Sequence, residues 1–165
     1  MNYAIALFYS YLALIALFFG WLHSISQSFY ELKKHRLGFV FTLFMFSLSM
    51  LIIVAAAKPI MTAAGICIIL VGAFPYFDKK GPGTEHNQKS AHYFLALTGI
   101  VLAMVSLWVE FGQWEVVVIS TCLAVLLKLL KVNNLFYWIE FIAMNAIFIG
   151  LKLSFFHLKI KMIFE

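Results

Sequence analysis

The amino-acid sequence predicts an all-α integral membrane protein, a bundle of six transmembrane helices without a separate soluble domain. Of the 165 residues, 64% are hydrophobic and only 12% are charged, whereas a soluble domain averages about 25% charged residues. Apolar stretches near the length that a spanning helix needs, roughly 20 residues, occur six times along the chain. This composition excludes a disordered chain, a disulfide scaffold and an ordinary water-soluble enzyme.

The six predicted spans fill most of a single transmembrane domain, residues 1–165. They cover residues 3–22, 38–57, 60–77, 92–111, 114–130 and 135–156. Lys58-Pro59 separates the second span from the third, because proline starts a helix but breaks its interior. The polar segment 78–89 contains Gly-Pro-Gly and is predicted to be a loop. No basic residue precedes Glu31, so the first span is predicted to be a retained helix rather than a cleaved signal peptide.

The basic residues of the loops predict the orientation. With six spans, the first, third and fifth loops lie on one side and carry eight basic residues, against three on the other side. The positive-inside rule places these loops in the cytoplasm and both termini outside, and we expect a bacterial inner membrane. The eight are Lys33, Lys34, Arg36, Lys79, Lys80, Lys89, Lys128 and Lys131. Since such loops anchor proteins against anionic lipid, the net charge of +5 indicates membrane lipids as partners and not nucleic acid.

Small residues predict which helices pack together, because they let helices approach closely inside lipid. One face of the first span carries Ala6, Ser10, Ala13, Leu17, Gly20 and Ser24, and the fourth span repeats this spacing with His92, Ala96, Gly99, Ala103, Ser106 and Glu110. The third span adds Gly65 and Gly72. We therefore expect these three spans to form the packed interior, and the second span, rich in Phe and Leu, to face lipid. The end of the sixth span, residues 152–161, is basic and amphipathic enough to lie along the membrane surface instead.

Glu140 is the leading candidate for a functional residue, because an ionisable group inside an apolar span is costly and marks a functional site. Two interpretations are open. Glu140 either lines a cavity on the cytoplasmic side or pairs with Lys128 or Lys131. In the first interpretation, the expected ligand-binding residues are those that gather at the same mouth, namely Ser26, Tyr30, His92, Tyr137 and Glu140.

The third loop offers candidate metal ligands. Asp78, Glu85, His86 and His92 combine carboxylates and imidazoles, which suit zinc or another divalent ion. However, His86 and His92 would be about 240° apart on a continuous helix, and no histidine pair with i, i+4 spacing occurs. No cofactor is therefore predicted. A divalent metal, with Asp78, His86 and His92 as catalytic residues and Glu140 beside them, is the alternative.

Three short motifs resemble a group of small bacterial multi-span membrane proteins of unknown function. They are Ser24-Ile25-Ser26-Gln27-Ser28-Phe29-Tyr30 after the first span, Ala64-Gly65 with Gly72-Ala73-Phe74-Pro75 in the third, and His92 opening the fourth. The resemblance covers the first four spans and implies no activity. It implies that Ser24, Ser26, Tyr30, Pro75 and His92 meet at the cytoplasmic mouth.

The expected function is non-enzymatic. We expect a cytoplasm-facing polar cavity that binds a lipid headgroup, an ion or a small amphipathic solute, in a protein that acts as an oligomeric channel or transporter or with a membrane partner protein. Two alternatives stay open. One is a membrane-embedded, metal-dependent lipid hydrolase, and the other is a partner subunit or membrane-disrupting effector that has no pocket.

Overall fold

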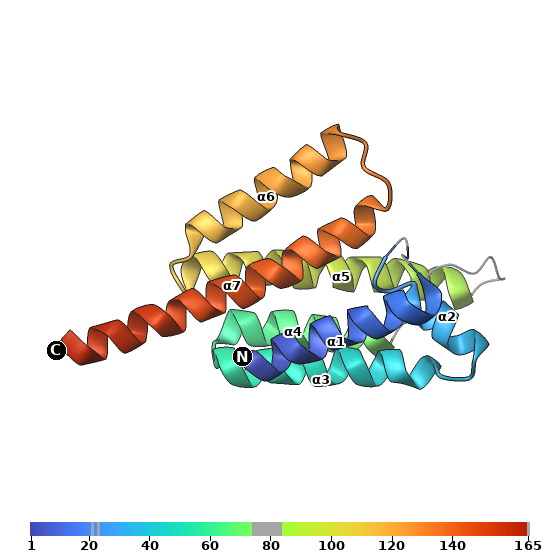
Figure 1. The fold of residues 1–165 in the computed structure, drawn as a ribbon, viewed down its shortest axis with the longest axis horizontal. Coiled ribbons are helices and arrows are strands. Elements are labelled where there is room, and N and C mark those ends of the chain that lie inside the picture. Colours follow the sequence, from blue (N-terminus) through green and yellow to red (C-terminus); the bar gives the residue numbers. More distant parts are fainter. Residues whose placement is uncertain (21, 23, 74–83, 165) are drawn as a thin grey trace.

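The structure, a computed structural model, describes residues 1–20, 22, 24–73 and 84–164, and every regular element within them is a helix (Figure 1). Six long helices follow the six predicted spans in order, and one short helix lies between the first two. The helices are α1 (Asn2–Phe19), α2 (Ser28–Lys34), α3 (Gly38–Ala56), α4 (Pro59–Ala73), α5 (Thr84–Val109), α6 (Trp114–Leu129) and α7 (Leu135–Phe164). The predicted all-α class is confirmed for the described residues.

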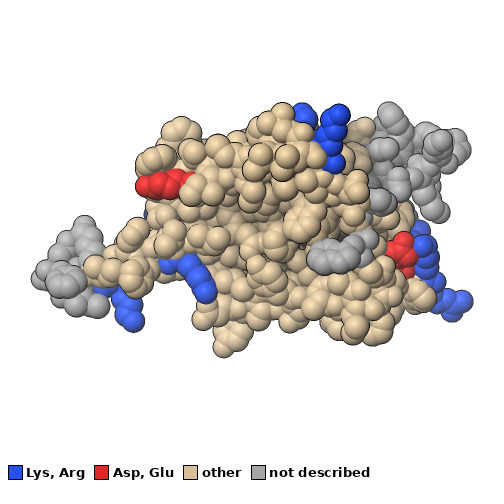
Figure 2. Space-filling view, turned by 45° about the horizontal axis from the view of Figure 1, so that its top comes forward, with Lys and Arg blue, Asp and Glu red and all other residues tan. Residues whose placement is uncertain are grey.

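Four helices are long and apolar enough to cross a membrane. They are α1, α3, the Ser90–Val109 part of α5 and the Leu135–Ile160 part of α7. The described part of α4 is apolar but has 15 residues, and α6 has 16. On the face shown in Figure 2, charged side chains are sparse and a broad surface between them carries none. These observations are consistent with a membrane protein.

The predicted helix breaks between the second and third spans and after the fourth are present. Helix α3 ends at Ala56, Ala57 adopts a left-handed conformation with φ of 48°, and α4 begins at Pro59. The turn between α5 and α6 contains Gly112 with φ of 65°. The first helix ends earlier than predicted, because Gly20 with φ of 73° follows its last residue. A glycine adopts this conformation without the steric cost that other residues incur.

Helix α3 buries one face and exposes large apolar side chains such as Phe39 and Val54 on the other, so the predicted contrast between a lipid-facing second span and a packed interior is too simple. Phe41, Leu48 and Ile52 are all fully or almost fully buried. Composition misled here, because Phe and Leu suit the lipid and the protein interior equally well. The predicted role of glycine in α4 is supported: a Cβ on Gly65 would lie 2.5 Å from Ile53 Cγ1 of α3.

Helix α1 packs through a different face from the predicted one. Its buried residues are Ala4, Phe8, Tyr11 and Ile15, whereas Ala6, Ser10, Ala13 and Leu17 are exposed. The Tyr11 ring stacks on the Phe44 ring of α3 with centroids 3.7 Å apart. Large aromatic side chains therefore fill the contact between these helices, and the small residues of α1 face outward.

Helices α5 and α7 frame one side of the bundle, and α6 joins them on the outside (Figure 1). The small-residue face predicted for α5 is buried, with His92, Gly99, Ala103 and Ser106 inside. Helix α6 contributes no buried residue. Residues 152–161 belong to α7, which continues as one helix through Phe164.

Candidate binding cavity

A cavity of about 450 Å³ lies between the first half of α5, the start of α7 and the segment that joins α1 to α2. We call it the Glu140 cavity. Its walls from α5 and α7 are mostly apolar, and polar side chains from all three segments gather in it. These polar side chains are Ser24, Ser26, Gln27, His92, Tyr93 and Glu140.

Glu140 binds the segment between α1 and α2 through hydrogen bonds. The Ile25 backbone N–H donates to Glu140 Oε2 with an N–O distance of 2.5 Å, and Ser26 Oγ donates to Oε1 at 3.1 Å. A carboxylate is a strong acceptor for such donors. No ion pair of Glu140 with Lys128 or Lys131 occurs among the described residues. The structure therefore favours the cavity interpretation of Glu140 over the ion-pair interpretation.

Both backbone polar groups of Ile25 form hydrogen bonds with side chains. While Glu140 accepts from its N–H, Ser28 Oγ donates to the Ile25 carbonyl oxygen at 2.6 Å. Ser28 Oγ also bonds to the Tyr11 hydroxyl at 2.5 Å. Because a hydroxyl has one proton, Tyr11 is the donor to Ser28. These bonds hold the turn that carries Ser24 and Ser26 in place at the cavity.

A second, apolar cavity of about 70 Å³ adjoins the Glu140 cavity. The two share Ser26, Ala96, Ile100 and Glu140 as wall residues. The other residues that line the smaller cavity are mostly buried and apolar, for example Phe8, Leu48 and Ile147, so this cavity lies in the apolar interior. The combined space is polar at its mouth and apolar at its depth.

Three of the five predicted ligand-binding residues, Ser26, His92 and Glu140, line the Glu140 cavity. The His92 side chain is only 2% exposed and its ring lies 5.9 Å from the Tyr93 ring, edge to face. The structure thus brings these three residues together at one cavity, although Ser26 and Glu140 are 114 residues apart in the sequence. Their role in binding stays a prediction.

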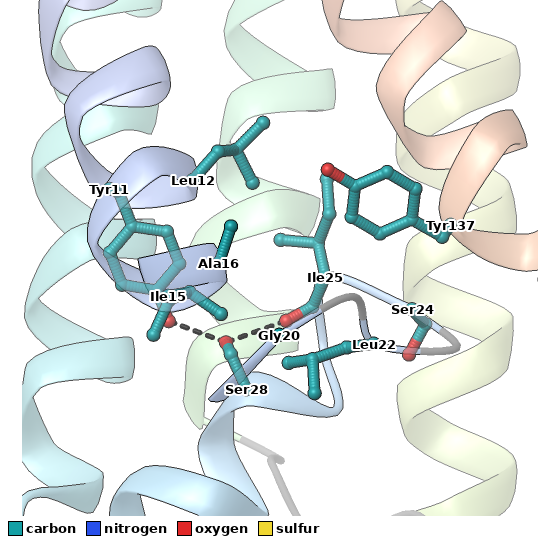
Figure 3. A pocket seen from close by; sticks show the side chains of 10 residues that line it. All are labelled: Tyr11, Leu12, Ile15, Ala16, Gly20, Leu22, Ser24, Ile25, Ser28 and Tyr137. Carbon is teal, nitrogen blue, oxygen red and sulfur yellow. Dashed lines mark hydrogen bonds between the residues drawn. The ribbon is translucent and has the colours of Figure 1, made fainter. Parts of the chain in front are cut away.

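The other two predicted residues lie elsewhere. Tyr137 lines a separate small pocket of about 10 Å³ together with Tyr11 and Ser28 (Figure 3). This space is sufficient for about one water molecule. Tyr30 does not line the Glu140 cavity, and its ring packs edge to face on Phe29 with centroids 5.5 Å apart.

The predicted metal ligands are mostly beyond what the structure describes. Asp78 lies outside the described residues, as do the side chains of Glu85 and His86. Within the described part of the chain, no group of three or more His, Cys, Asp or Glu side chains is placed to hold a metal ion. Of the four candidates, only His92 is placed by the structure.

A third cavity, of about 340 Å³, lies at the other end of the α5–α7 pair. We call it the Glu110 cavity. Its polar wall residues are Lys58, Glu110, Gln113, Ser154 and His157. From the sequence, Glu110 was expected on the packing face of the fourth span, and this cavity was not predicted.

Glu110 caps the start of α4. The Ile60 N–H donates to Glu110 Oε1 at 2.9 Å, the Met61 N–H donates to Oε2 at 3.2 Å, and Ser106 Oγ donates to Oε2 as well. The first N–H groups of a helix have no partner within it, and Pro59 at its first position has none to offer. Burial raises the pKa of Glu110, but these hydrogen bonds and the charge of Lys58 outweigh it, and the net pKa lies below its ordinary value.

The sequence contains a signal for this cap. Pro59 marks the start of a helix, and Glu110 lies at the end of the fourth predicted span, which is on the same side of the predicted membrane. A carboxylate is favourable beside the positive end of a helix dipole. The pairing of an acidic span end with a neighbouring proline-started helix could have predicted the contact.

Comparisons of the chain with models of protein families, with curated proteins and with solved structures find no match. The resemblance to small bacterial multi-span proteins stays a prediction from short motifs. Function is therefore inferred from the cavities.

Proposed function

We propose that this chain is a polytopic membrane protein that binds a small amphipathic molecule in the Glu140 cavity. The observation that carries the proposal is the junction, at Ser26 and Glu140, of two cavities: one of about 450 Å³ whose mostly apolar walls carry several polar side chains, and a smaller apolar one of about 70 Å³. Small-molecule sites are typically concave, mostly apolar and supplied with a few polar groups, at volumes of about 300–1,000 Å³. A molecule with one polar and one apolar end matches this arrangement.

The chemistry of the mouth favours a head group that carries positive charge or donates hydrogen bonds. Glu140 presents a carboxylate, which only accepts hydrogen bonds when ionised. Ser24 and Gln27 add a hydroxyl and an amide at the same mouth. A primary amine on an alkyl chain is the simplest molecule that combines this head with an apolar tail.

The proposed topology has all six long helices crossing a bacterial inner membrane. The loops after α1, α4 and α6 then face the cytoplasm under the positive-inside rule, and the Glu140 cavity opens near that side because it lies at the start of α7. Membrane lipids are the proposed partners and the proposed source of the amphipathic ligand.

Native mass spectrometry of the purified protein with dodecylamine tests this function. Ile139→Trp places a large side chain at a wall of the Glu140 cavity, and we expect it to abolish the bound-amine peak seen with the wild type. Ile149→Trp is the matched control, because Ile149 is on the same helix, is 51% exposed and does not line the cavity. Equal dodecylamine binding by all three proteins would contradict the proposal.

A metal-dependent lipid hydrolase is the second candidate. The placement of His92 and Glu140 on one cavity favours it, because an imidazole and a carboxylate are typical zinc ligands. Asp78 or His86 would supply the remaining ligands. Elemental analysis distinguishes the candidates: stoichiometric zinc or another divalent metal that is lost in His92→Ala supports the hydrolase, whereas metal-free protein that binds dodecylamine supports the binding function.

A further inference from the structure

The Glu110 cavity is bordered by one positive and one negative side chain that do not contact each other. Lys58 and Glu110 both line its volume of about 340 Å³, and they form no ion pair, although the structure describes both residues. Burial raises the pKa of Glu110, and its hydrogen bonds and the charge of Lys58 outweigh this effect. The ammonium group therefore acts on the carboxylate from a distance, across a space that both groups border.

Glu110 can accept a further hydrogen bond without losing its role as a helix cap. Its Oε1 accepts one hydrogen bond, from the Ile60 N–H, and its Oε2 accepts two, from the Met61 N–H and from Ser106 Oγ. An ionised carboxylate offers about four acceptor positions on its two oxygens. One position on Oε1 is thus left for a donor that enters the cavity.

The other polar walls of the cavity supply hydrogen-bond donors beside Lys58. Gln113 is only 6% exposed and lines the cavity, and its side-chain Nε2 donates to the Phe111 carbonyl oxygen at 3.4 Å. Its amide carries a second N–H. His157 adds an imidazole to the same wall. An ammonium with neutral donors around it suits an oxyanion such as a phosphate.

The apolar walls of the cavity continue onto the outer surface of the bundle. Phe155 and Leu158 of α7 line the cavity and are also 42% and 58% exposed. In a bilayer, exposed apolar side chains of a helix bundle lie against lipid acyl chains. A molecule can therefore place a polar group in the cavity while its acyl chains stay among those of the bilayer.

We infer that the Glu110 cavity binds the headgroup of a phospholipid that carries a primary amine, with the phosphate at Lys58 and the amine at Glu110. A lysine ammonium is a common ligand of phosphate groups, and the open position on Glu110 takes an N–H. A choline headgroup has no N–H to donate, and a glycerol headgroup has no positive charge, so phosphatidylethanolamine combines the required features. This site is separate from the Glu140 cavity and goes beyond the proposed amphiphile binding.

Native mass spectrometry of the purified protein in detergent tests whether the headgroup is recognised. Dioleoyl phosphatidylethanolamine, phosphatidylcholine and phosphatidylglycerol are compared, because they differ only in the headgroup. We expect the wild type to bind phosphatidylethanolamine about tenfold more tightly than either of the other two lipids. Equal affinity for all three lipids would overturn the inference.

A charge variant tests the phosphate contact. Lys58→Met removes the charge and keeps a long side chain, and we expect the affinity for phosphatidylethanolamine to fall about tenfold, since a hydrogen bond to a charged group is lost. Lys152→Met is the matched control, because Lys152 is exposed on α7 and does not line the cavity. An equal affinity of the two variants would overturn the inference.

A steric variant tests the place of binding. Leu158→Trp fills the mouth of the Glu110 cavity and is expected to abolish the lipid-bound peak, whereas Leu153→Trp, on the same helix but not at the cavity, is expected to retain it. Ile139→Trp, which obstructs the Glu140 cavity, is expected to retain it as well. Lipid binding that is lost in Ile139→Trp and kept in Leu158→Trp would overturn this site and leave the proposed amphiphile binding intact.

The soluble compound glycerophosphoethanolamine distinguishes a lipid from a free phosphoester, because it has the same headgroup without acyl chains. We expect it not to displace phosphatidylethanolamine when both are present at equal concentration. Displacement at equal concentration that is lost in Lys58→Met would assign the cavity to a soluble phosphoester and overturn the lipid as its ligand.

Discussion

Glu110 and Glu140 have similar hydrogen-bond partners at opposite ends of the α5–α7 pair, but they differ in their surroundings. Each carboxylate accepts a hydrogen bond from a serine hydroxyl and from backbone N–H groups of a distant segment. The partner of Glu110 is the first turn of α4, so helix capping accounts for its position. The partner of Glu140 is a turn beside a large cavity that continues into the apolar interior. Both carboxylates line a cavity, but only the cavity beside Glu140 adjoins a second space in the apolar interior, and only Glu110 caps a helix.

The largest expected effect is on stability at the Glu110 end. Glu110→Ala leaves the N–H groups of Ile60 and Met61 without their acceptor, and each unsatisfied buried donor costs about 1–3 kcal/mol. We expect a loss of about 2 kcal/mol in the free energy of unfolding, measured by denaturant titration in detergent micelles. Glu115→Ala is the matched control, because Glu115 is exposed in the first turn of α6. Equal stability of the two variants would refute the capping role.

Glu140→Gln is expected to affect binding more than stability. The glutamine oxygen can still accept the Ile25 N–H, but the negative charge at the cavity mouth is lost. We expect dodecylamine affinity to fall about tenfold, equivalent to about 1.4 kcal/mol, as measured by isothermal titration calorimetry in micelles. Glu110→Gln is the comparison variant and is expected to retain the affinity. A similar fall in both variants would show that the two ends do not differ as described.

The serine partners allow a smaller, paired test. Ser106→Ala removes one donor to Glu110 and Ser26→Ala removes one donor to Glu140. Each hydrogen bond contributes about 1 kcal/mol. We expect Ser106→Ala to lower only the stability to denaturant, and Ser26→Ala to lower dodecylamine affinity several-fold as well. An unchanged affinity in Ser26→Ala would show that this hydroxyl does not contribute to dodecylamine binding.

The smallest expected effect is a difference in acid stability. Because the pKa of Glu110 in the folded protein lies below its ordinary value, its ionised form stabilises the fold above about pH 4.3, and this contribution is lost as the pH falls further. Glu110→Gln has no such group to titrate. We therefore expect the wild type to lose more stability than Glu110→Gln between about pH 5 and pH 3 in thermal unfolding scans. Parallel curves of thermal stability against pH for the two proteins would contradict the lowered pKa of Glu110.

The sequence predicted the helices better than it predicted their faces. Apolar runs and the breaks at Lys58-Pro59 and Gly112 predicted the six long helices in order. In an apolar environment the backbone N–H and C=O groups must pair with each other, which leaves few alternatives to a helix. The buried face of α1 was predicted wrongly, and the buried face of α3 was not predicted. Side chains that face lipid and side chains that face protein are both apolar, so hydrophobic periodicity does not distinguish them. The helix α2 was missed because its seven residues carry no span signal.

Part of the candidate site could be predicted from the sequence. Ser26, His92 and Glu140 were grouped because each lies at the same predicted membrane side, and the structure places all three on one cavity. The exact partner of Glu140 was not predictable from spacing, because Ile25 lies 115 residues away. Tyr137 and Tyr30 shared the membrane side but not the cavity, since depth along the membrane does not fix the direction of a side chain around a helix.

Anomalous diffraction from crystals grown with 12-bromododecylamine tests the central claim most directly. The amphiphile-binding account places the bromine in the apolar cavity near Ile100 and Ile147, with the amine toward Glu140. Bromine density only on outer helix surfaces, such as that of α6, would contradict it.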